Sequence, residues 1–276
     1  MTGAGATTIL ARDVLPEPKA DDSAIARSRR ALLLRALRLV HAEAELVVVM
    51  HVSRRGGLAL IRLAGELSVF KLITCQADWK KRLARPFGWN PARRAHAMSA
   101  ALLQAGIPVC PVTEHGELNL PEAPRALWTI SRFVPGACNL RELKAQAQPG
   151  VRAPATPAMG RLLGETLRLL RRLHDAGFEH RDYHPGNLLV NPGPGGNLLG
   201  EDAWLSLVDL ETVVQRKATA ARRARDLRRL LETFADRRAS ASLIDDALHT
   251  YAGDDKALAE RIVATRRMAG LRRRLR

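Results

Sequence analysis

The sequence is poor in cysteine and aromatic residues and lacks long hydrophobic runs, and each scarcity excludes a class of protein. Its three cysteines among 276 residues lie far apart, which excludes a disulfide scaffold, predicts no zinc site and favours a reducing compartment. They are Cys75, Cys110 and Cys138. An aromatic content of 4% is low for a protein that stacks single-stranded bases. Purely apolar runs such as 46–50 are far shorter than the roughly 18 residues that a membrane span needs.

Positive charge, by contrast, is abundant. The chain carries 44 Lys and Arg against 28 Asp and Glu, a formal net charge of +16. Such an excess is typical of proteins that meet nucleic acid, an anionic membrane surface or an acidic substrate. The sequence contains no finger, basic zipper or aromatic RNA-binding signature, so nucleic acid is the least favoured of the three. The first residues show no basic head followed by an apolar segment, so we expect no secretory signal and a cytoplasmic protein.

The N-terminal residues predict a leader followed by a helix. Residues 1–22, which include two prolines, suit a disordered leader. From Ser23, a suitable N-cap, residues 23–46 have the apolar spacing of a helix, with arginines on its other faces. Such a basic amphipathic helix either lies on an anionic bilayer or packs on the domain's own surface, and the sequence leaves both interpretations open.

Three runs of strand-forming residues come next, separated by short glycine-bearing turns. They predict an antiparallel meander over 45–53, 56–65 and 66–73. A helix over 92–106 and a further strand over 126–134 follow.

Beyond residue 135 the pattern becomes mainly helical. Apolar spacing predicts helices over 139–146 and 157–177. A loop rich in Gly, Pro and Asn over 191–204 precedes a short apolar strand over 205–211, and basic helices complete the chain. A small β-rich part followed by a larger helical part predicts an α+β fold.

The segment HRDYHPGN at residues 180–187 carries the clearest chemical signal. Asp182 and Asn187, five residues apart on a loop between a helix and a strand, can converge on one point, where they could hold a metal-bound phosphate. The strand that follows places Asp209 at its end, and a hairpin would set that carboxylate beside Asn187. Far upstream, Lys71 lies in the third strand among apolar neighbours, an unusual place for a cation without an anionic partner.

Together these residues resemble the protein-kinase-like superfamily, with its strand-three lysine, HRDxxxxN loop and following aspartate. More narrowly, the chain resembles the bacterial lipopolysaccharide core kinases, the Kdo and heptose kinases, over about residues 45–235. That resemblance is carried by VFKLI, RRAHAMSAALLQAGIPVCPV, SRFVPGACNLREL, LRRLHDAGFEHRDYHPGNLLV and ARDLRRLL. It implies a two-lobed protein-kinase-like fold: a small antiparallel β-sheet N-lobe over 23–134, which binds nucleotide, and a larger, mainly α-helical C-lobe over 135–276, which carries the catalytic loop and binds the acceptor.

The resemblance also implies roles for the site residues, with ATP and Mg²⁺ as cofactors. Lys71 would bind the α and β phosphates, Asn187 and Asp209 would hold Mg²⁺, and Asp182 would accept or orient the proton of the acceptor hydroxyl. We expect His180 to hold the loop by hydrogen bonds and His184 to stabilise the turn before the Pro-Gly pair. Glu211 is either a ligand of a second metal ion or a surface carboxylate.

One feature departs from the protein-kinase pattern, because residues 90–105 contain no acidic residue that could pair with Lys71. Asp78, Glu66 or Asp209 could supply the carboxylate, or catalysis could be weakened.

Three functions therefore stay open. The first is a kinase acting on a sugar hydroxyl of the lipopolysaccharide inner core, with an anionic sugar or glycolipid acceptor and peripheral contact at the cytoplasmic face of the inner membrane. The second is a small-molecule kinase of the aminoglycoside or choline type, which shares the HxDxHPGN loop. The third is a catalytically weak kinase-like module that binds through basic segments such as the tail 261–276. Residues 215–276 hold 17 Lys and Arg against 8 Asp and Glu, which favours an anionic over a cationic acceptor.

Overall fold

The computed structural model describes residues 24–53, 55–74, 90–147, 157–234 and 241–265. The expected leader, the Ser23 cap and the end of the basic tail lie outside these residues. The chain divides into two compact units, which we call the sheet unit and the helical unit. Within the described residues, the sheet unit holds 24–101 and 110–135, and the helical unit holds 102–109 and 136–265. None of the described helices combines the length and apolar composition that a membrane crossing requires.

The sheet unit is built on five antiparallel strands in the order β1-β2-β3-β5-β4. Their bounds are β1 Glu45–Ser53, β2 Gly56–Leu63, β3 Glu66–Ile73, β4 Val112–Leu120 and β5 Ala123–Arg132. The expected three-strand meander is confirmed, and the strand expected over 126–134 is β5, which begins and ends slightly earlier. Strand β4 was not predicted, because its sequence VTEHGELNL is polar at most positions, as suits a strand at the edge of a sheet.

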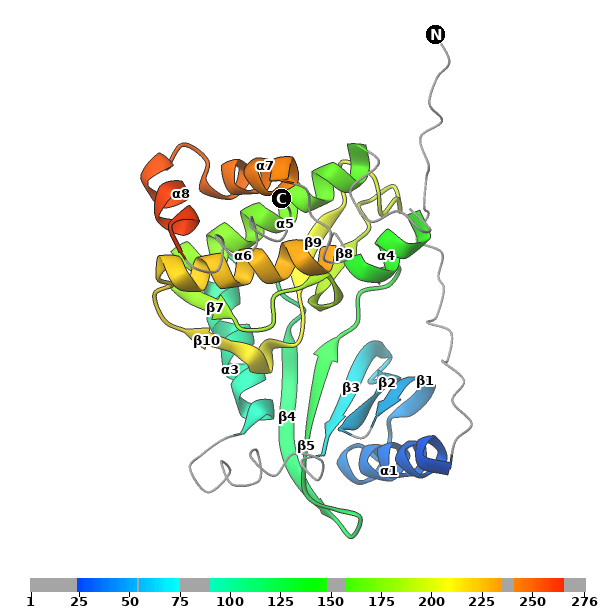
Figure 1. Cartoon of the computed structure of the whole chain (residues 1–276). Coiled ribbons are helices and arrows are strands. Elements are labelled where there is room, and N and C mark those ends of the chain that lie inside the picture. Colours follow the sequence, from blue (N-terminus) through cyan, green and yellow to red (C-terminus); the bar gives the residue numbers. More distant parts are fainter. Residues whose placement is uncertain (1–23, 54, 75–89, 148–156, 235–240, 266–276) are drawn as a thin grey trace. The chain divides into compact units, whose positions relative to one another are not determined.

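Helix α1 (Ala24–Val40) packs on β1, β2 and β3 (Figure 1). Its buried residues Leu32, Leu33 and Leu37 join a core with Phe70 and Leu72, and each buried leucine stabilises the unit by roughly 1.5–3 kcal/mol. The apolar face of the helix therefore packs on the protein's own sheet, as one of the two interpretations expected. The prediction that the helix continues to residue 46 was wrong, because the chain turns after Val40 and enters β1 at Glu45.

Among its described residues, the helical unit has five complete helices and the last turn of α3 (Pro91–Gln104). The five are α4 Leu140–Ala147, α5 Pro157–Asp175, α6 Ala220–Phe234, α7 Ala241–Ala252 and α8 Lys256–Val263. Helix α5 packs on α7, and α6 packs on α8. The helices expected over 92–106, 139–146 and 157–177 are confirmed as α3, α4 and α5. The prediction that basic helices complete the chain is confirmed for α6 but wrong for α7, which has two aspartates and no Lys or Arg.

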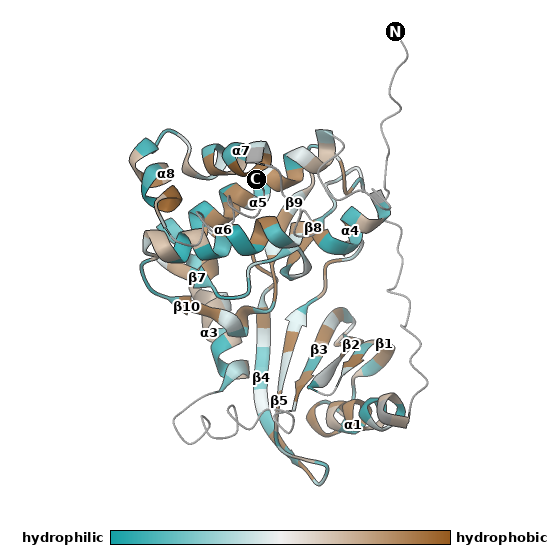
Figure 2. Cartoon of the chain, in the orientation of Figure 1, coloured by the Kyte–Doolittle hydropathy of each residue, from teal (hydrophilic) through white to brown (hydrophobic). Residues whose placement is uncertain are grey.

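Short strands frame the HRDYHPGN segment within this unit. Strands β6 (Cys138–Asn139), β8 (Leu188–Asn191) and β9 (Trp204–Leu207) form one sheet, and β7 (Phe178–His180) pairs with β10 (Val213–Gln215). Two 3-10 turns lie between them, η2 (Pro185–Asn187) and η3 (Leu210–Thr212). Helices α4 and α6 both contact η2, so the loop is held from two sides. Along α6, hydrophobic and hydrophilic residues alternate, and its buried side includes Leu227, Leu230 and Leu231 (Figure 2).

Candidate active site

The loop between β7 and β8 is anchored by its own side chains. The hydroxyl of Tyr183 is buried and donates to the carbonyl oxygen of Thr166 on α5 at 2.7 Å, and burial raises the Tyr183 pKa. The ring of His184 accepts a hydrogen bond at Nδ1 from the backbone N–H of Gly186 at 3.0 Å. This contact confirms the expectation that His184 stabilises the turn. The loop is thus fixed to the helix behind it before any ligand binds.

His180 ties the loop to the segment that carries Asp209. Its ring is fully buried, and Nε2 lies 3.1 Å from the carbonyl oxygen of Val208, which can only accept, so Nε2 carries the proton. Nδ1 is then an acceptor, and the backbone N–H of Asp182 donates to it at 3.3 Å. Burial is the main cause that lowers the His180 pKa, which fits a neutral ring. The expectation that His180 holds the loop by hydrogen bonds is confirmed.

Asn187 and the strand beside it complete the connection between the two segments. The side-chain Nδ2 of Asn187 donates to the backbone carbonyl of Asp182 at 3.0 Å, and the N–H of Val208 donates to the carbonyl of Asn187 at 3.1 Å. Strands β8 and β9 pair from Leu188 opposite Leu207, so the expected hairpin is present and Asp209 lies two residues beyond its end. Asp182, Asn187 and Asp209 are therefore brought into one hydrogen-bonded region of the helical unit.

The backbone of Asp209 is left-handed, with φ 62° and ψ 46°. This conformation costs a non-glycine residue of order 1 kcal/mol or more, although Asp tolerates it better than most. Thr212 holds it, because its N–H and its hydroxyl both bond to the Asp209 carbonyl, at 3.4 and 3.2 Å. The chain thus turns sharply at the residue expected to bind metal. Glu211, in the η3 turn that follows, is half-buried, and its role stays a prediction.

Two exposed arginines that sequence reasoning did not single out contact the loop. Arg229 on α6 forms an ion pair with Oδ1 of Asp182, and Arg141 on α4 lies 3.2 Å from Nδ1 of His184. Burial lowers the pKa of His184, and the charges of Arg141 and Arg229 lower it further, while Asp182 acts in the opposite direction. Only the position of each arginine in the tertiary structure distinguishes it from the many others in this chain.

A buried carboxylate lies three residues before Asp182. Glu179 on β7 has no exposed surface and forms ion pairs with Arg216, Arg222 and Arg225, at 2.6, 3.3 and 3.5 Å. Arg222 and Arg225 belong to α6, so this cluster fixes the helix against the strand that leads into the loop.

A second buried network continues from α6 into α5 and α7. His174 Nε2 lies 3.2 Å from Asp226, His174 Nδ1 lies 2.7 Å from the hydroxyl of Tyr251, and Arg223 donates to that hydroxyl at 3.0 Å. Burial lowers the pKa of His174, so its ring is neutral and donates to Asp226 from Nε2. Sequence reasoning had no signal for this network, which joins residues from three helices.

Lys71 lies in the sheet unit, opposite Leu58 on β2 and Thr129 on β5. It is half-buried on the face opposite the α1 core, since the adjacent positions Phe70 and Leu72 point into that core.

Strand geometry narrows the choice of carboxylate that could pair with Lys71. Glu66 is five residues away on the same regular strand, which places the two side chains on opposite faces and about 16 Å apart along β3. Glu66 is therefore excluded as the partner. Asp78 lies outside the described residues.

The donor set of the loop fits a magnesium ion. No group of three or more His, Cys, Asp or Glu side chains forms a metal-site arrangement within the residues described. Mg²⁺ does not require one, because it is usually bound by one or two protein oxygens together with phosphates and water. The amide nitrogen of Asn187 is engaged by the Asp182 carbonyl, so its oxygen Oδ1 is the end available to a cation, and Asp209 supplies a carboxylate.

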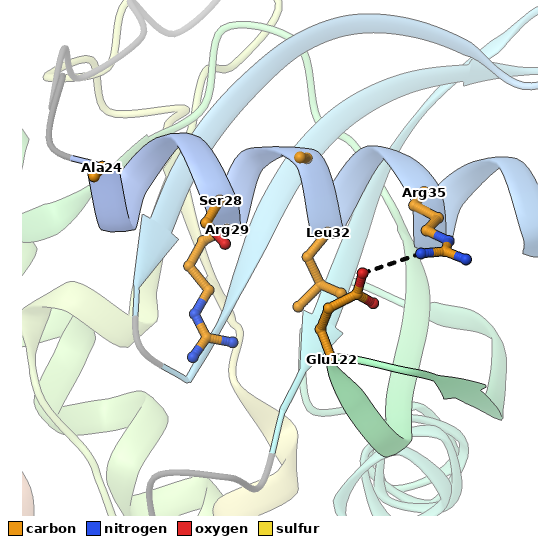
Figure 3. A pocket seen from close by; sticks show the side chains of 7 residues that line it. Ala24, Ser28, Arg29, Leu32, Arg35 and Glu122 are labelled. Atoms are coloured by element: carbon orange, nitrogen blue, oxygen red, sulfur yellow. Dashed lines mark hydrogen bonds and ion pairs between the residues drawn. The ribbon is translucent and has the colours of Figure 1, made fainter.

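A separate pocket lies beside α1 in the sheet unit (Figure 3). Arg29 and Leu32 line it, and Arg35 forms an ion pair with Glu122 across it at 3.0 Å. It contains none of the residues expected at the active site.

An antiparallel sheet followed by helices, with an HRD-type loop bonded to an aspartate-bearing hairpin, defines the protein-kinase-like class of phosphotransferases. The model of the lipopolysaccharide kinase (Kdo/WaaP) family matches residues 74–251, more than half of the chain, and the protein belongs to that family. The fold is similar to that of a solved structure described as WaaP in complex with acyl carrier protein. That match has a TM-score of 0.60 and 20% sequence identity, and covers 89% of this chain and 94% of the other. Among curated proteins, none matches the chain.

Proposed function

We propose that this protein transfers the γ-phosphoryl group of ATP to a sugar hydroxyl of the lipopolysaccharide inner core. The observation that carries the proposal is the hydrogen-bonded loop that joins Asp182, Asn187 and the segment of Asp209 in a member of the lipopolysaccharide kinase family. The two buried side chains of His180 and Tyr183 hold that loop, as catalysis by positioning requires.

In the proposed reaction, the acceptor hydroxyl oxygen attacks the γ-phosphorus and its proton passes to the carboxylate of Asp182. The bond between the γ-phosphorus and the bridging oxygen breaks, and ADP leaves. Lys71 would bind the α and β phosphates. Asn187 and Asp209 would hold Mg²⁺, which neutralises negative charge on the phosphates.

Charge at the loop supports an anionic acceptor. The charged side chains from other elements that contact Asp182 and His184, within the described residues, are two arginines, Arg229 and Arg141. Cationic acceptors such as aminoglycosides or choline would be repelled by these groups, whereas a carboxylated or phosphorylated sugar would be attracted. The aminoglycoside and choline alternative is therefore disfavoured.

We further propose that the protein works in the cytoplasm, with peripheral contact at the inner-membrane surface, where a glycolipid acceptor is embedded. The net charge of +16 supports attraction to such an anionic surface. Because the similar WaaP structure is a complex with acyl carrier protein, that protein is a further partner to test.

The test is phosphoryl transfer from labelled Mg-ATP to deacylated inner-core oligosaccharide by the purified protein. We expect incorporation that falls by about 10²- to 10⁴-fold in Asp182→Asn. The matched control is Asp246→Asn, a change at an exposed carboxylate on α7, which leaves the rate unchanged.

Three results contradict the proposal in different ways. Equal phosphorylation of the oligosaccharide by wild type and Asp182→Asn removes the proposed base. Binding of ATP without transfer to this acceptor, in both proteins, supports the non-catalytic module instead. Transfer to kanamycin or choline in place of the oligosaccharide supports the small-molecule kinase.

A further inference from the structure

Arg229 lies where it can control the orientation of the Asp182 carboxylate. Nη2 of Arg229 pairs with Oδ1 of Asp182, and Nη1 of the same guanidinium lies 3.5 Å from the carbonyl oxygen of Arg181. One planar group thus reaches both the side chain of the proposed base and the backbone just before it. A lysine would have to reach both oxygens from one nitrogen, whereas the guanidinium contacts them from two nitrogens of a planar fork.

The two oxygens of Asp182 are in different surroundings. Oδ1, the atom that Arg229 contacts, is buried, while the side chain as a whole is 31% exposed. Oδ2 lies 3.6 Å from Nε2 of His184. Since Nδ1 of that ring accepts from Gly186, Nε2 of the neutral ring carries the proton and turns it toward Oδ2. Arg229 therefore occupies one oxygen and leaves Oδ2 as the oxygen open to an acceptor hydroxyl.

Helix α6 holds Arg229 in a fixed position. Arg222, Arg225 and Arg229 are spaced by three and four residues, so they share one face of the helix. The first two hold Glu179, and the third reaches Asp182, three residues further along the chain. The helix is thus paired with the chain at two points, one before the loop and one within it.

We propose that Arg229 is a positioning residue that orients the Asp182 carboxylate for proton transfer from the acceptor. This inference rests on the proposed function of Asp182. Misplacing a catalytic group by about 1 Å can lower a rate by about 100-fold, so loss of this contact should lower kcat rather than weaken substrate binding.

The variants are Arg229→Gln and Arg229→Lys, with Arg228→Gln as the matched control. Arg228 is the neighbouring arginine on α6 and pairs with Glu232 at 3.0 Å. With Mg-ATP and deacylated inner-core oligosaccharide, we expect Arg229→Gln to lower kcat by about 10- to 100-fold while both KM values change by less than about 3-fold. Arg229→Lys should recover part of kcat, and Arg228→Gln should match wild type.

Two further measurements separate positioning from a structural role. Millimolar guanidinium should partly restore kcat to Arg229→Ala without changing the melting temperature. Amide hydrogen exchange in the peptide spanning 178–187 should be faster in Arg229→Gln than in Arg228→Gln, a comparison that needs no acceptor, because Arg229 no longer tethers the backbone at Arg181.

The double variant Asp182→Asn/Arg229→Gln distinguishes the two proposals. If Arg229 acts through Asp182, the double variant is no slower than Asp182→Asn alone. A large effect of Asp182→Asn with wild-type kcat and exchange in Arg229→Gln overturns the positioning role and leaves the proposed function standing. Wild-type kcat in Asp182→Asn overturns the proposed role of Asp182 as the base, and the absence of transfer to the oligosaccharide by wild type overturns the proposed function itself. A loss in Arg229→Gln confined to the KM of the oligosaccharide makes Arg229 an acceptor-binding residue and also overturns this inference.

Discussion

The buried carboxylate of Glu179 provides the most direct test of what holds the loop of Asp182 in place. In Glu179→Gln, three guanidiniums lose the carboxylate on which they converge, while the amide keeps a similar shape. Breaking a fully buried ion pair typically costs about 3–5 kcal/mol. The arginine side chains here are 34%, 36% and 31% exposed, so water can partly solvate them. We therefore expect a loss of about 2–3 kcal/mol.

The assay is thermal and urea unfolding followed by circular dichroism. A loss of this size should lower Tm by roughly 4–12 °C for a domain of this length. The control is Glu165→Gln on α5, whose ion pair with Arg168 is exposed and should contribute no more than about 0.5 kcal/mol. If Glu179→Gln unfolds within about 0.5 kcal/mol of wild type, the cluster contributes little net stability and the reasoning fails.

Three further outcomes can be measured. Gly56→Ala should destabilise the sheet unit by more than about 2 kcal/mol, since φ at Gly56 is 139° and a Cβ would lie 1.8 Å from the carbonyl oxygen of Leu72 on the paired strand β3. Gly160→Ala, in open space on α5, should instead stabilise the protein by about 0.5–1 kcal/mol. Equal unfolding midpoints for the two variants would refute this contrast. Burial lowers the pKa of His174, so the unfolded state binds more protons than the folded state. The free energy of unfolding is therefore greatest above the unfolded pKa of about 6.5 and falls as the pH drops below it, by up to about 1.4 kcal/mol at pH 5.5. Urea unfolding above the unfolded pKa of about 6.5 and at pH 5.5 should show a smaller loss of stability in His174→Asn than in wild type. The same pH dependence in both proteins would contradict this prediction. Burial raises the pKa of Cys138 to about 11, so at pH 8 only about 0.1% is thiolate and iodoacetamide labelling, followed by mass spectrometry, should be far slower than for free cysteine.

Much of the fold could be predicted because hydrophobic periodicity is a local signal. Strands β1 to β3 are runs of strand-forming residues separated by short glycine-bearing turns, and α5 keeps an apolar stripe over its full length. The exceptions have physical reasons. Strand β4 is mostly polar, so alternation alone does not distinguish it from a loop. The helical spacing of α1 continues past its end, and only the pairing of β1 with β2 shows where the helix stops.

The residue types of the candidate site and their order along the chain can be read from the sequence alone. The motif HRDYHPGN, the aspartate after an apolar strand and the lysine of β3 resemble the protein-kinase pattern, and that resemblance implied phosphoryl transfer. The two histidines of the motif were also assigned correctly, since each accepts a hydrogen bond from a backbone N–H two residues further along the chain.

Tertiary structure alone decided the surroundings of those residues. The chain has 44 Lys and Arg, and nothing in their spacing distinguishes Arg229 from its neighbours until α6 packs beside the loop. The burial of Glu179 likewise required the arginines of α6 to reach the carboxylate on β7. Local sequence encodes the chemistry of a residue, whereas its partners come from segments far apart in the chain, which only packing brings together.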